Sequence, residues 1–326
     1  MRHEQAAALL KQYGIERPAI AELKHSENMT YKVSDPASGA DYLLRIHRPA
    51  TANLAGAQHT RAGLRSELRL LAELARNTEL AVQTPVSSLS GSLITETEEG
   101  GRASLCSLLK WIEGRELKKE DLADERLSRE LGSLTAKLHA FTRGCAGVRP
   151  EDRPEYGEAR IGLMLTQISR GVDKGLFGRE ELGIVESSMR FMNGQLAETL
   201  NGPGNWGIIH ADLNSSNILV TPAGELAFID YGLFGYGYYM HDLAMAALNA
   251  PADRRRDVVA GYFGEGKAPN RAESVLGGFM LMAVLGYYAF QMENEKIHPW
   301  IRERMPKLCA ERCRPFLNGE PIFHLF

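Results

Sequence analysis

Two apolar runs joined by a short polar segment constrain this chain more than any other feature of its sequence. The first piece covers residues 208–220, the second covers residues 226–232, and each contains a run that is typical of a β-strand. The segment between them, residues 221–225, contains proline and glycine and is typical of a turn. We therefore expect the two runs to pair as a hairpin, which would bring Asp230 back beside Asn217.

Three polar side chains stand beside these apolar runs, and their chemistry indicates a site. Asn217 and Asp230 would present an amide oxygen and a carboxylate from rigid strands, which suits Mg²⁺ because this ion takes oxygen ligands. Asp212 lies five positions before Asn217 and would remain able to accept a proton. The sequence thus predicts a metal ion and a general base close together.

The same residues carry a resemblance to a known family. His210, Asp212 and Asn217 match the H-x-D-x-x-x-x-N pattern of a kinase catalytic loop, and Asp230 begins a D-x-G element like the metal-binding D-F-G. The run of aromatic residues and glycines over residues 228–237 differs from ordinary protein kinases. Taken together, these motifs resemble the aminoglycoside phosphotransferase and choline kinase family, a kinase-like superfamily that also includes homoserine kinases.

Two departures from the family pattern are visible. Ala211 stands where glycine is usual, and Met240-His241-Asp242-Leu243-Ala244 replaces the usual Y-D-L-A. The resemblance otherwise covers nearly the whole chain. It implies an α+β, protein-kinase-like, two-lobed fold, with a small antiparallel-sheet N-lobe at residues 1–113 and a larger helical C-lobe at residues 114–326. ATP would lie in the cleft of such a fold.

The N-terminal third follows the order expected of a kinase small lobe. A helix is predicted over residues 3–13, followed by strands at residues 20–23, 31–33 and 42–47, with a strong turn signal at residues 35–39. The loop at residues 25–30 occupies the place of the glycine-rich phosphate loop but contains no glycine, and taken by itself it is a polar hairpin turn. Because the family often uses a loop with serine and asparagine here, the resemblance assigns Asn28 to nucleotide binding.

Arg45 and Glu67 are predicted to form an ion pair. Residues 61–76 have helical periodicity, and Glu67 lies within the leucine-rich face while Glu73 points to the opposite side. A carboxylate on an apolar face is costly unless it is paired. The resemblance implies Arg45 as the partner, because the family's helix glutamate pairs with its basic strand residue. By resemblance Arg45 holds the ATP phosphates and Glu67 holds Arg45. The alternatives are a solvated arginine and a glutamate paired within its own helix.

The link between the lobes is predicted at the end of the sheet. Strands are expected at residues 92–95 and 103–109, and the following Trp111-Ile112-Glu113-Gly114 resembles the family hinge. The resemblance therefore assigns Leu109, Trp111 and Ile112 to adenine binding through their backbone groups.

The remainder of the chain has mainly helical patterns. Helices are expected at residues 127–143, 180–200, 252–263, 271–290 and 300–313, whereas residues 144–178 have a less regular pattern. His139 and His210 are interpreted as structural. Asp242 is expected to cap the helix that it begins.

Composition excludes several classes of protein. A formal net charge of −3 and a pI near 6.3 disfavour a nucleic-acid partner. The four cysteines are few and scattered, so we expect reduced thiols, including Cys309 and Cys313. The N-terminus lacks the apolar core of a signal peptide, and the apolar run at residues 275–290 is too short for a membrane span. We expect a cytoplasmic protein with no membrane partner.

These observations predict an ATP- and Mg²⁺-dependent transfer of the γ-phosphate to a hydroxyl group of a small molecule. Asp212 would take the proton of the acceptor, and Asn217 and Asp230 would hold Mg²⁺. Aminoglycosides, homoserine, choline-like alcohols and sugars remain open as acceptors, as does the oligomeric state. The alternatives are a Ser/Thr protein kinase of the same fold and a catalytically silent nucleotide-binding or structural protein, which the substitution at Ala211 and the glycine-free loop keep open.

Overall fold

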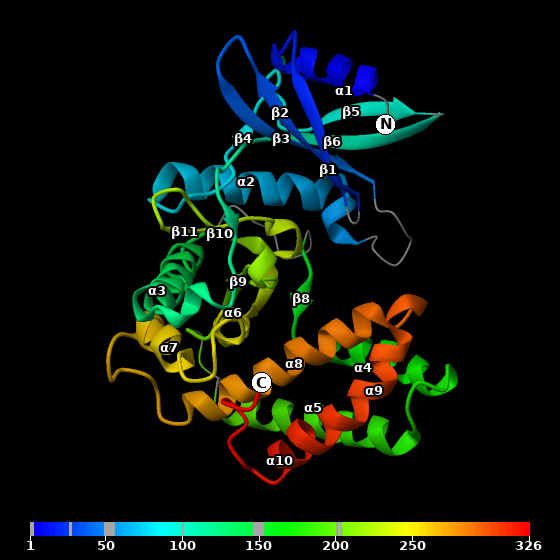
Figure 1. Ribbon diagram of the computed structural model, residues 1–326, viewed down its shortest axis with the longest axis vertical. Helices are drawn as coiled ribbons and strands as arrows, with labels where there is room; N and C mark the ends of the chain where they lie inside the picture. The colour runs from blue at the N-terminus through cyan, green and yellow to red at the C-terminus, as the bar shows by residue number, and fades with distance from the viewer. Residues whose placement is uncertain are drawn as a thin grey trace. The chain divides into compact units, whose positions relative to one another are not determined.

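The computed structural model describes residues 3–25, 28–48, 56–99, 101–145, 153–199, 202 and 204–326 (Figure 1). The chain forms two compact units. The first unit consists of Met1–Arg115, Cys145–Pro154 and Leu219–Phe234. The second unit consists of Glu116–Gly144, Glu155–Ile218 and Gly235–Phe326.

An antiparallel sheet forms the main part of the first unit. Its strands are ordered β1-β2-β3-β6-β4, and β5 also pairs with β6. The buried and partly buried residues of β2 alternate, as expected for a strand with one face in a core. The strands are β1 (Ala19–His25), β2 (Met29–Asp35), β3 (Ala40–His47), β4 (Pro85–Val86), β5 (Thr95–Glu99) and β6 (Arg102–Lys110).

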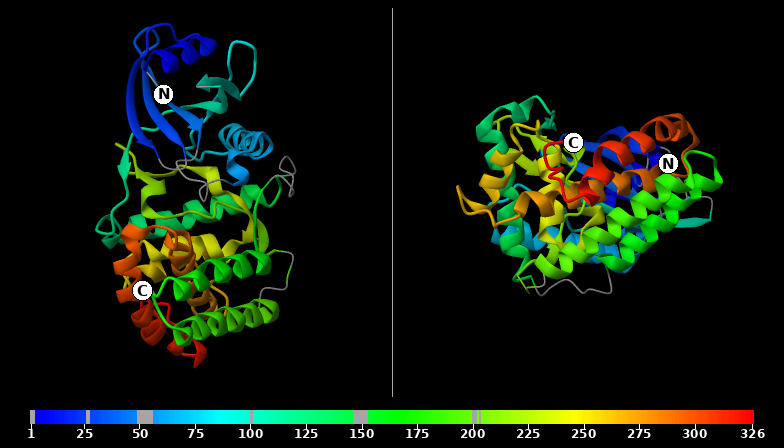
Figure 2. Two further views of the ribbon diagram at one scale, coloured as in Figure 1. Left: turned by 90° about the vertical axis from the view of Figure 1, so that its right-hand side faces the viewer. Right: turned by 90° about the horizontal axis from the view of Figure 1, so that it is seen from below.

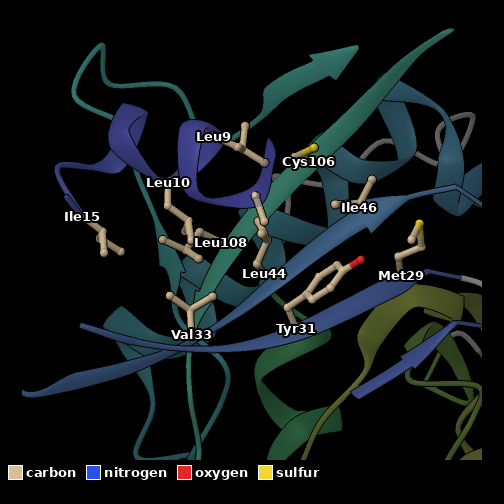
Figure 3. Close-up of a cluster of buried hydrophobic side chains, with 11 residues drawn as sticks. Leu9, Leu10, Ile15, Met29, Tyr31, Val33, Leu44, Ile46, Cys106 and Leu108 are labelled. Carbon is tan, nitrogen blue, oxygen red and sulfur yellow. The ribbon is translucent and has the colours of Figure 1, made fainter. Parts of the chain in front are cut away.

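Helix α1 (His3–Leu10) covers one face of this sheet. It continues into a 3₁₀ turn, Lys11–Tyr13, and ends at Gly14 with φ 77°. Leu9 and Leu10 of the helix pack on Val33, Leu44 and other buried side chains of the strands (Figure 3). Helix α2 (Arg61–Asn77) brings Glu67 to Arg45, whose side chain leaves the sheet on the face opposite Leu44.

The predicted hairpin between the two apolar runs is confirmed. Strand β10 (Ile218–Val220) pairs with β11 (Leu226–Phe228), and β7 (Arg115–Glu116) is the third strand of this small sheet. The turn is closed by Thr221 N–H, which donates to the Glu225 carbonyl at 2.9 Å. Gly224 takes φ 76° there, a conformation that glycine adopts without strain.

Helices dominate the second unit, and α8 packs against α4, α5 and α6 (Figure 2). It contains a three-stranded sheet with the order β8-β12-β9. The helices are α3 (Glu125–Thr142), α4 (Glu158–Asp173), α5 (Arg179–Thr199), α6 (Tyr239–Leu248), α7 (Arg255–Phe263), α8 (Ala272–Gln291), α9 (His298–Leu308) and α10 (Arg314–Leu317), and the strands are β8 (Glu155–Tyr156), β9 (Trp206–Ile209) and β12 (Gly235–Tyr238).

Helices α3 and α7 cross with their backbones almost in contact, and a glycine stands at the crossing on each side. A Cβ atom on Gly132 would lie 1.9 Å from the Val258 carbonyl oxygen, and one on Gly261 would lie 2.0 Å from the Arg129 carbonyl oxygen. Only glycine allows this approach, which brings Tyr262 of α7 to His139 of α3.

Helix α8 is the one described helix that is long and apolar enough to cross a membrane by length and composition. In the most apolar window of this helix, 61% of the residues are buried inside the protein. It therefore has the burial of a core helix, as the sequence predicted.

Two expectations about the helical part were wrong. Residues 158–173, expected to be irregular, form α4, which buries Ile161, Met164 and Ile168 on one face. Asp242 is not a capping residue, because α6 begins three residues earlier, at Tyr239, and Tyr238 holds the N-cap position.

All four cysteines are free, and Cys309–Cys313 forms a π-helical turn.

Candidate active site

The predicted pairing of Arg45 with Glu67 is confirmed within the first unit. Arg45 Nη1 donates to Glu67 Oε1 at 2.7 Å, and the two residues are only 3% and 1% exposed. Arg45 lies on β3, an interior strand, so the alternative of a solvated edge-strand arginine is excluded. The role of the pair in nucleotide binding stays a prediction.

Not all donors of Arg45 are satisfied by this pair. Arg45 Nε lies 3.4 Å from Ser107 Oγ, whereas Nη2 is buried and has no hydrogen-bond partner among the described residues. A buried, unpaired donor of a charged group is costly, so its presence indicates a place for an anionic oxygen. Neighbouring His47 is buried too, and burial, with the charge of Arg45, holds the pKa of His47 well below its ordinary value.

The catalytic-loop residues lie in the second unit, directly after β9. Ala211 has φ 66°, which is the left-handed region. This explains why glycine is usual at the position, since a Cβ atom is strained there. Asp242 holds the bend from α6, because its Oδ2 accepts from His210 N at 2.7 Å and its Oδ1 accepts from Ala211 N at 2.8 Å.

Asp242 is itself held by a buried chain of hydrogen bonds. Its Oδ2 also contacts His139 Nε2 at 3.0 Å, and His139 Nδ1 lies 2.9 Å from the Tyr262 hydroxyl. Burial opposes the charge of Asp242, but the His139 hydrogen bond and the nearby histidine rings outweigh it and hold the pKa of this carboxyl below its ordinary value. Asp242 thus holds the backbone of the loop by hydrogen bonds, and His139 orients Asp242, which agrees with the structural roles expected of both residues.

The carboxylate of Asp212 is oriented by two asparagines. Asn214 Nδ2 donates to Asp212 Oδ1 at 2.8 Å, and Asn217 Nδ2 donates to Asp212 Oδ2 at 2.7 Å and to the Asp212 carbonyl at 3.0 Å. Because the amide nitrogen of Asn217 faces Asp212, its Oδ1 remains available and accepts no hydrogen bond from the described residues. The structure therefore brings the side chains of Asp212 and Asn217 together.

Asp230 lies in the first unit, at the end of the β10–β11 hairpin. It has φ 59° and caps the 3₁₀ turn Tyr231–Leu233, with Oδ1 accepting from Gly232 N at 3.3 Å. Its Oδ2 has no partner among the described residues, so it is available to a cation. Since Asp230 and Asn217 belong to different units, their meeting at one ion stays a prediction.

The donor set fits Mg²⁺ better than a softer metal. Among the described residues, no group of three or more His, Cys, Asp or Glu side chains is placed to hold a metal ion. One carboxylate oxygen and one amide oxygen suit an ion that retains waters and binds phosphate oxygens, which is how Mg²⁺ is usually held beside nucleotides.

The residues assigned to adenine and phosphate binding are placed as follows. Leu109 lies near the end of β6 and is fully buried. The backbone N–H of Trp111 already donates to the Asp41 carbonyl at 3.0 Å. Of the three hinge residues, Ile112 therefore has the backbone N–H that no described residue occupies. Asn28 has a buried Oδ1 that finds no hydrogen-bond partner among the residues described, and residues 26 and 27 of its loop lie outside them.

Sequence reasoning missed Arg153. This arginine is 5% exposed and donates to three backbone carbonyl oxygens of the first unit, those of Gly63, Gly232 and Phe234. It comes from an irregular stretch, so no periodicity marked it. An arginine beside proline in such a stretch gives no signal that separates it from a solvated one.

The chain is similar to known proteins over most of its length. A family model described as the phosphotransferase enzyme family matches residues 20–274. An uncharacterized protein of Deinococcus radiodurans is 26% identical over 244 residues. That match covers 74% of this chain but 64% of the relative, so less than two thirds of the relative's length is spanned.

Several solved kinase structures have the same fold. A microcompartment-associated aminopropanol kinase has a TM-score of 0.77 at 23% identity, covering 96% of this chain and 97% of the other. An amicoumacin kinase in complex with AMP-PNP, Ca²⁺ and Ami has a TM-score of 0.68 at 18% identity, with 94% and 91% covered. A choline kinase from Cryptosporidium parvum has a TM-score of 0.67 at 13% identity, with 93% and 90% covered. The expected two-lobed α+β kinase-like fold is thereby confirmed.

Proposed function

This chain belongs to the phosphotransferase enzyme family, and from that premise we propose that it transfers the γ-phosphate of ATP to a hydroxyl group of a small molecule. Its motifs and its fold are similar to those of the aminoglycoside phosphotransferases and choline kinases. Phosphoryl transfer depends on orientation and charge neutralisation. Side chains that are already held by hydrogen bonds, such as Asp212 and Arg45, suit this reaction.

Asp212 acts as the base in this proposal. Its carboxylate, oriented by Asn214 and Asn217, accepts the proton of the acceptor hydroxyl. The freed oxygen forms a bond to the γ-phosphorus, the bond from that phosphorus to the β–γ bridging oxygen breaks, and ADP leaves. Asn217 Oδ1 and Asp230 Oδ2 would hold Mg²⁺, which when bound neutralises charge on the phosphates.

The buried Arg45–Glu67 pair is the observation that carries the proposal. Burying an ion pair contributes little to stability, and the pair leaves Arg45 Nη2 without a partner. A phosphate oxygen would satisfy that donor with a charge-assisted hydrogen bond. In the proposed complex Arg45 binds the α- and β-phosphates, Asn28 contacts the phosphates from its loop, and Ile112 offers its backbone to the adenine beside Leu109 and Trp111.

For the acceptor we propose an alcohol that also carries an amine. The similar structures are described as kinases of aminopropanol and choline and as a gentamicin complex. These compounds have in common a hydroxyl group and a cationic nitrogen. The net charge of −3 is compatible with such a substrate and disfavours nucleic acid. The protein would act in the cytoplasm.

A test of this function measures ADP release with Mg²⁺-ATP against a panel of acceptors. The panel contains aminopropanol, ethanolamine, choline, homoserine, an aminoglycoside, a neutral sugar and a generic serine-containing protein, and each product is identified by its mass increase of one phosphate. GTP replaces ATP in a parallel series. We expect transfer to one of the amine-bearing alcohols and no transfer without Mg²⁺, and the GTP series measures the preference for the nucleotide base.

The other outcomes decide against specific parts of the proposal. Transfer to the protein serine alone would establish a protein kinase instead. Transfer to the neutral sugar alone would contradict the amine-bearing acceptor. Failure to bind Mg²⁺-ATP in calorimetry, together with no turnover on any acceptor, would favour a catalytically silent scaffold.

A further inference from the structure

Arg153 connects helix α2 to the segment that follows Asp230, and the proposed chemistry needs these two parts of the first unit to stay fixed relative to each other. Its Nη1 donates to the Gly63 carbonyl at 3.1 Å, Nη2 donates to the Gly232 carbonyl at 2.5 Å, and Nε donates to the Phe234 carbonyl at 2.8 Å. Its guanidinium also lies 3.9 Å from the centre of the Phe234 ring. One buried side chain thus joins α2 to the turn that follows Asp230.

Both ends of this connection lie next to groups of the candidate site. Gly63 is one helical turn before Glu67, and in an α-helix the carbonyl of residue 63 is the acceptor for the N–H of residue 67. At the other end, Gly232 N–H donates to Asp230 Oδ1 while the Gly232 carbonyl accepts from Arg153. One residue, Gly232, therefore links the Arg153 guanidinium to the Asp230 carboxylate through its two backbone hydrogen bonds.

The backbone conformation of Asp230 is one that the Arg153 hydrogen bonds can help to maintain. Asp230 has a left-handed backbone at φ 59° and ψ 66°, a conformation that is uncommon outside glycine although aspartate adopts it more readily than most residues. Phe234 N–H donates to the Tyr231 carbonyl at 3.1 Å and closes the turn. Arg153 donates to the carbonyls of Gly232 and Phe234 in the same segment. A guanidinium is suited to this, because its planar donors are fixed relative to one another.

We propose that Arg153 is a positioning residue for phosphoryl transfer: it locks the Asp230 turn to helix α2, so that the metal-binding carboxylate and the Glu67–Arg45 pair keep one geometry. Arg153 does not touch substrate in this proposal. Its catalytic consequence rests on the proposed function, whereas the lock between the two segments does not.

The test uses Arg153→Lys, which keeps the charge and most of the volume but cannot reach three carbonyls at once. Arg160→Lys, at an exposed position of α4, is the matched control. The first measurement is hydrogen–deuterium exchange of the free protein, followed by mass spectrometry. In Arg153→Lys, peptides over residues 61–77 and 226–236 should both exchange faster, while peptides over α5 remain as in wild type.

The second measurement is turnover as a function of Mg²⁺ concentration. Since misplacement of a catalytic group by about 1 Å can lower the rate about 100-fold, we expect Arg153→Lys to lower kcat at least about tenfold. The Mg²⁺ concentration at half-maximal activity should rise about tenfold if the weakened coordination costs about 1.4 kcal/mol. The KM of the acceptor should stay within about twofold of wild type, because Arg153 has no part in acceptor binding.

Arg153→Ala adds a rescue experiment. It leaves a space lined by the three carbonyls and the Phe234 ring, which free guanidinium at a non-denaturing concentration can fill. Guanidinium should restore slow exchange of residues 226–236 in this variant and leave Arg160→Ala unchanged.

The proposal is overturned if Arg153→Lys exchanges like wild type in either segment, or if its Mg²⁺ dependence is unchanged. Faster exchange throughout both units would also overturn it, since that would show a general contribution to stability. If wild type transfers no phosphate to any acceptor, the proposed function fails, and the exchange measurement still decides whether Arg153 joins the two segments.

Discussion

Asp242 Oδ1 accepts a hydrogen bond of 2.8 Å from the backbone N–H of Ala211, the residue whose φ of 66° sets the bend between His210 and Asp212. A residue with a side chain thus occupies a conformation that favours glycine. The buried carboxylate stabilises it, and that carboxylate is supported in turn by His139. The alanine therefore occupies a bend that glycine would adopt without strain, and it stores strain there.

Replacing Ala211 with glycine should relieve this strain. We expect Ala211→Gly to raise the free energy of unfolding by about 1 kcal/mol, because an alanine at positive φ costs more than glycine loses in the unfolded chain. Ala140→Gly, at an exposed position of α3, should instead lower it by about 1 kcal/mol. Urea denaturation of the three proteins measures both changes. Equal destabilisation by the two substitutions would show that Ala211 is not strained.

Removing the charge of Glu67 should affect nucleotide binding and stability together. Glu67→Gln leaves the buried Arg45 without a compensating charge, so we expect unfolding free energy to fall by about 3 kcal/mol. The KM for ATP should rise about tenfold because Arg45 loses its orientation. Glu73→Gln is the control, since Glu73 lies on the exposed side of the same helix. An ATP KM unchanged by Glu67→Gln, measured by steady-state kinetics, would contradict the assigned role.

Two buried histidines predict a loss of stability in mild acid. Burial lowers the pKa of both His47 and His241, so near pH 6 the folded protein binds fewer protons at these rings than the unfolded chain does. The free energy of unfolding should therefore fall as pH drops below about 6.5, by at most about 1.4 kcal/mol per pH unit for each ring.

Urea denaturation at pH values between about 5 and 7.5 tests this pH dependence, since the unfolded rings titrate in that range. The double variant His47→Gln, His241→Gln should have a flatter profile than wild type, whereas His324→Gln, at an exposed position, should keep the wild-type slope. If the double variant keeps that slope as well, other groups cause the acid sensitivity.

Sequence reasoning was most successful where periodicity and local motifs determine structure. The helical phase of residues 61–76 placed Glu67 on the buried side and led to its pairing with Arg45, which the structure has at 2.7 Å. The D-x-x-x-x-N motif marked Asp212 and Asn217 as candidate site residues, and in the structure their side chains close this six-residue loop. The buried side of a helix and the span of a short loop follow from local geometry, whereas Arg45 was assigned to Glu67 by the family resemblance.

Contacts between distant segments could not be predicted in the same way. Arg153 acts on carbonyls of residues 63, 232 and 234, and backbone acceptors leave no mark in a sequence. The capping role expected of Asp242 was wrong for a similar reason. A short polar residue near a helix start is typical of a cap, but here the carboxylate is directed to His210 and Ala211, which lie about thirty positions earlier.

The transfer of phosphate by wild type, Asp212→Asn and Asp253→Asn, each with Mg²⁺-ATP and the acceptor identified from the panel, tests the central claim most directly. Asp253 is exposed in the second unit, so its variant controls for the loss of one negative charge. The account predicts that Asp212→Asn binds Mg²⁺-ATP like wild type but lowers kcat by about 100-fold or more, since a general base contributes about that much, while Asp253→Asn stays within about twofold. Turnover by Asp212→Asn close to that of Asp253→Asn would contradict the account.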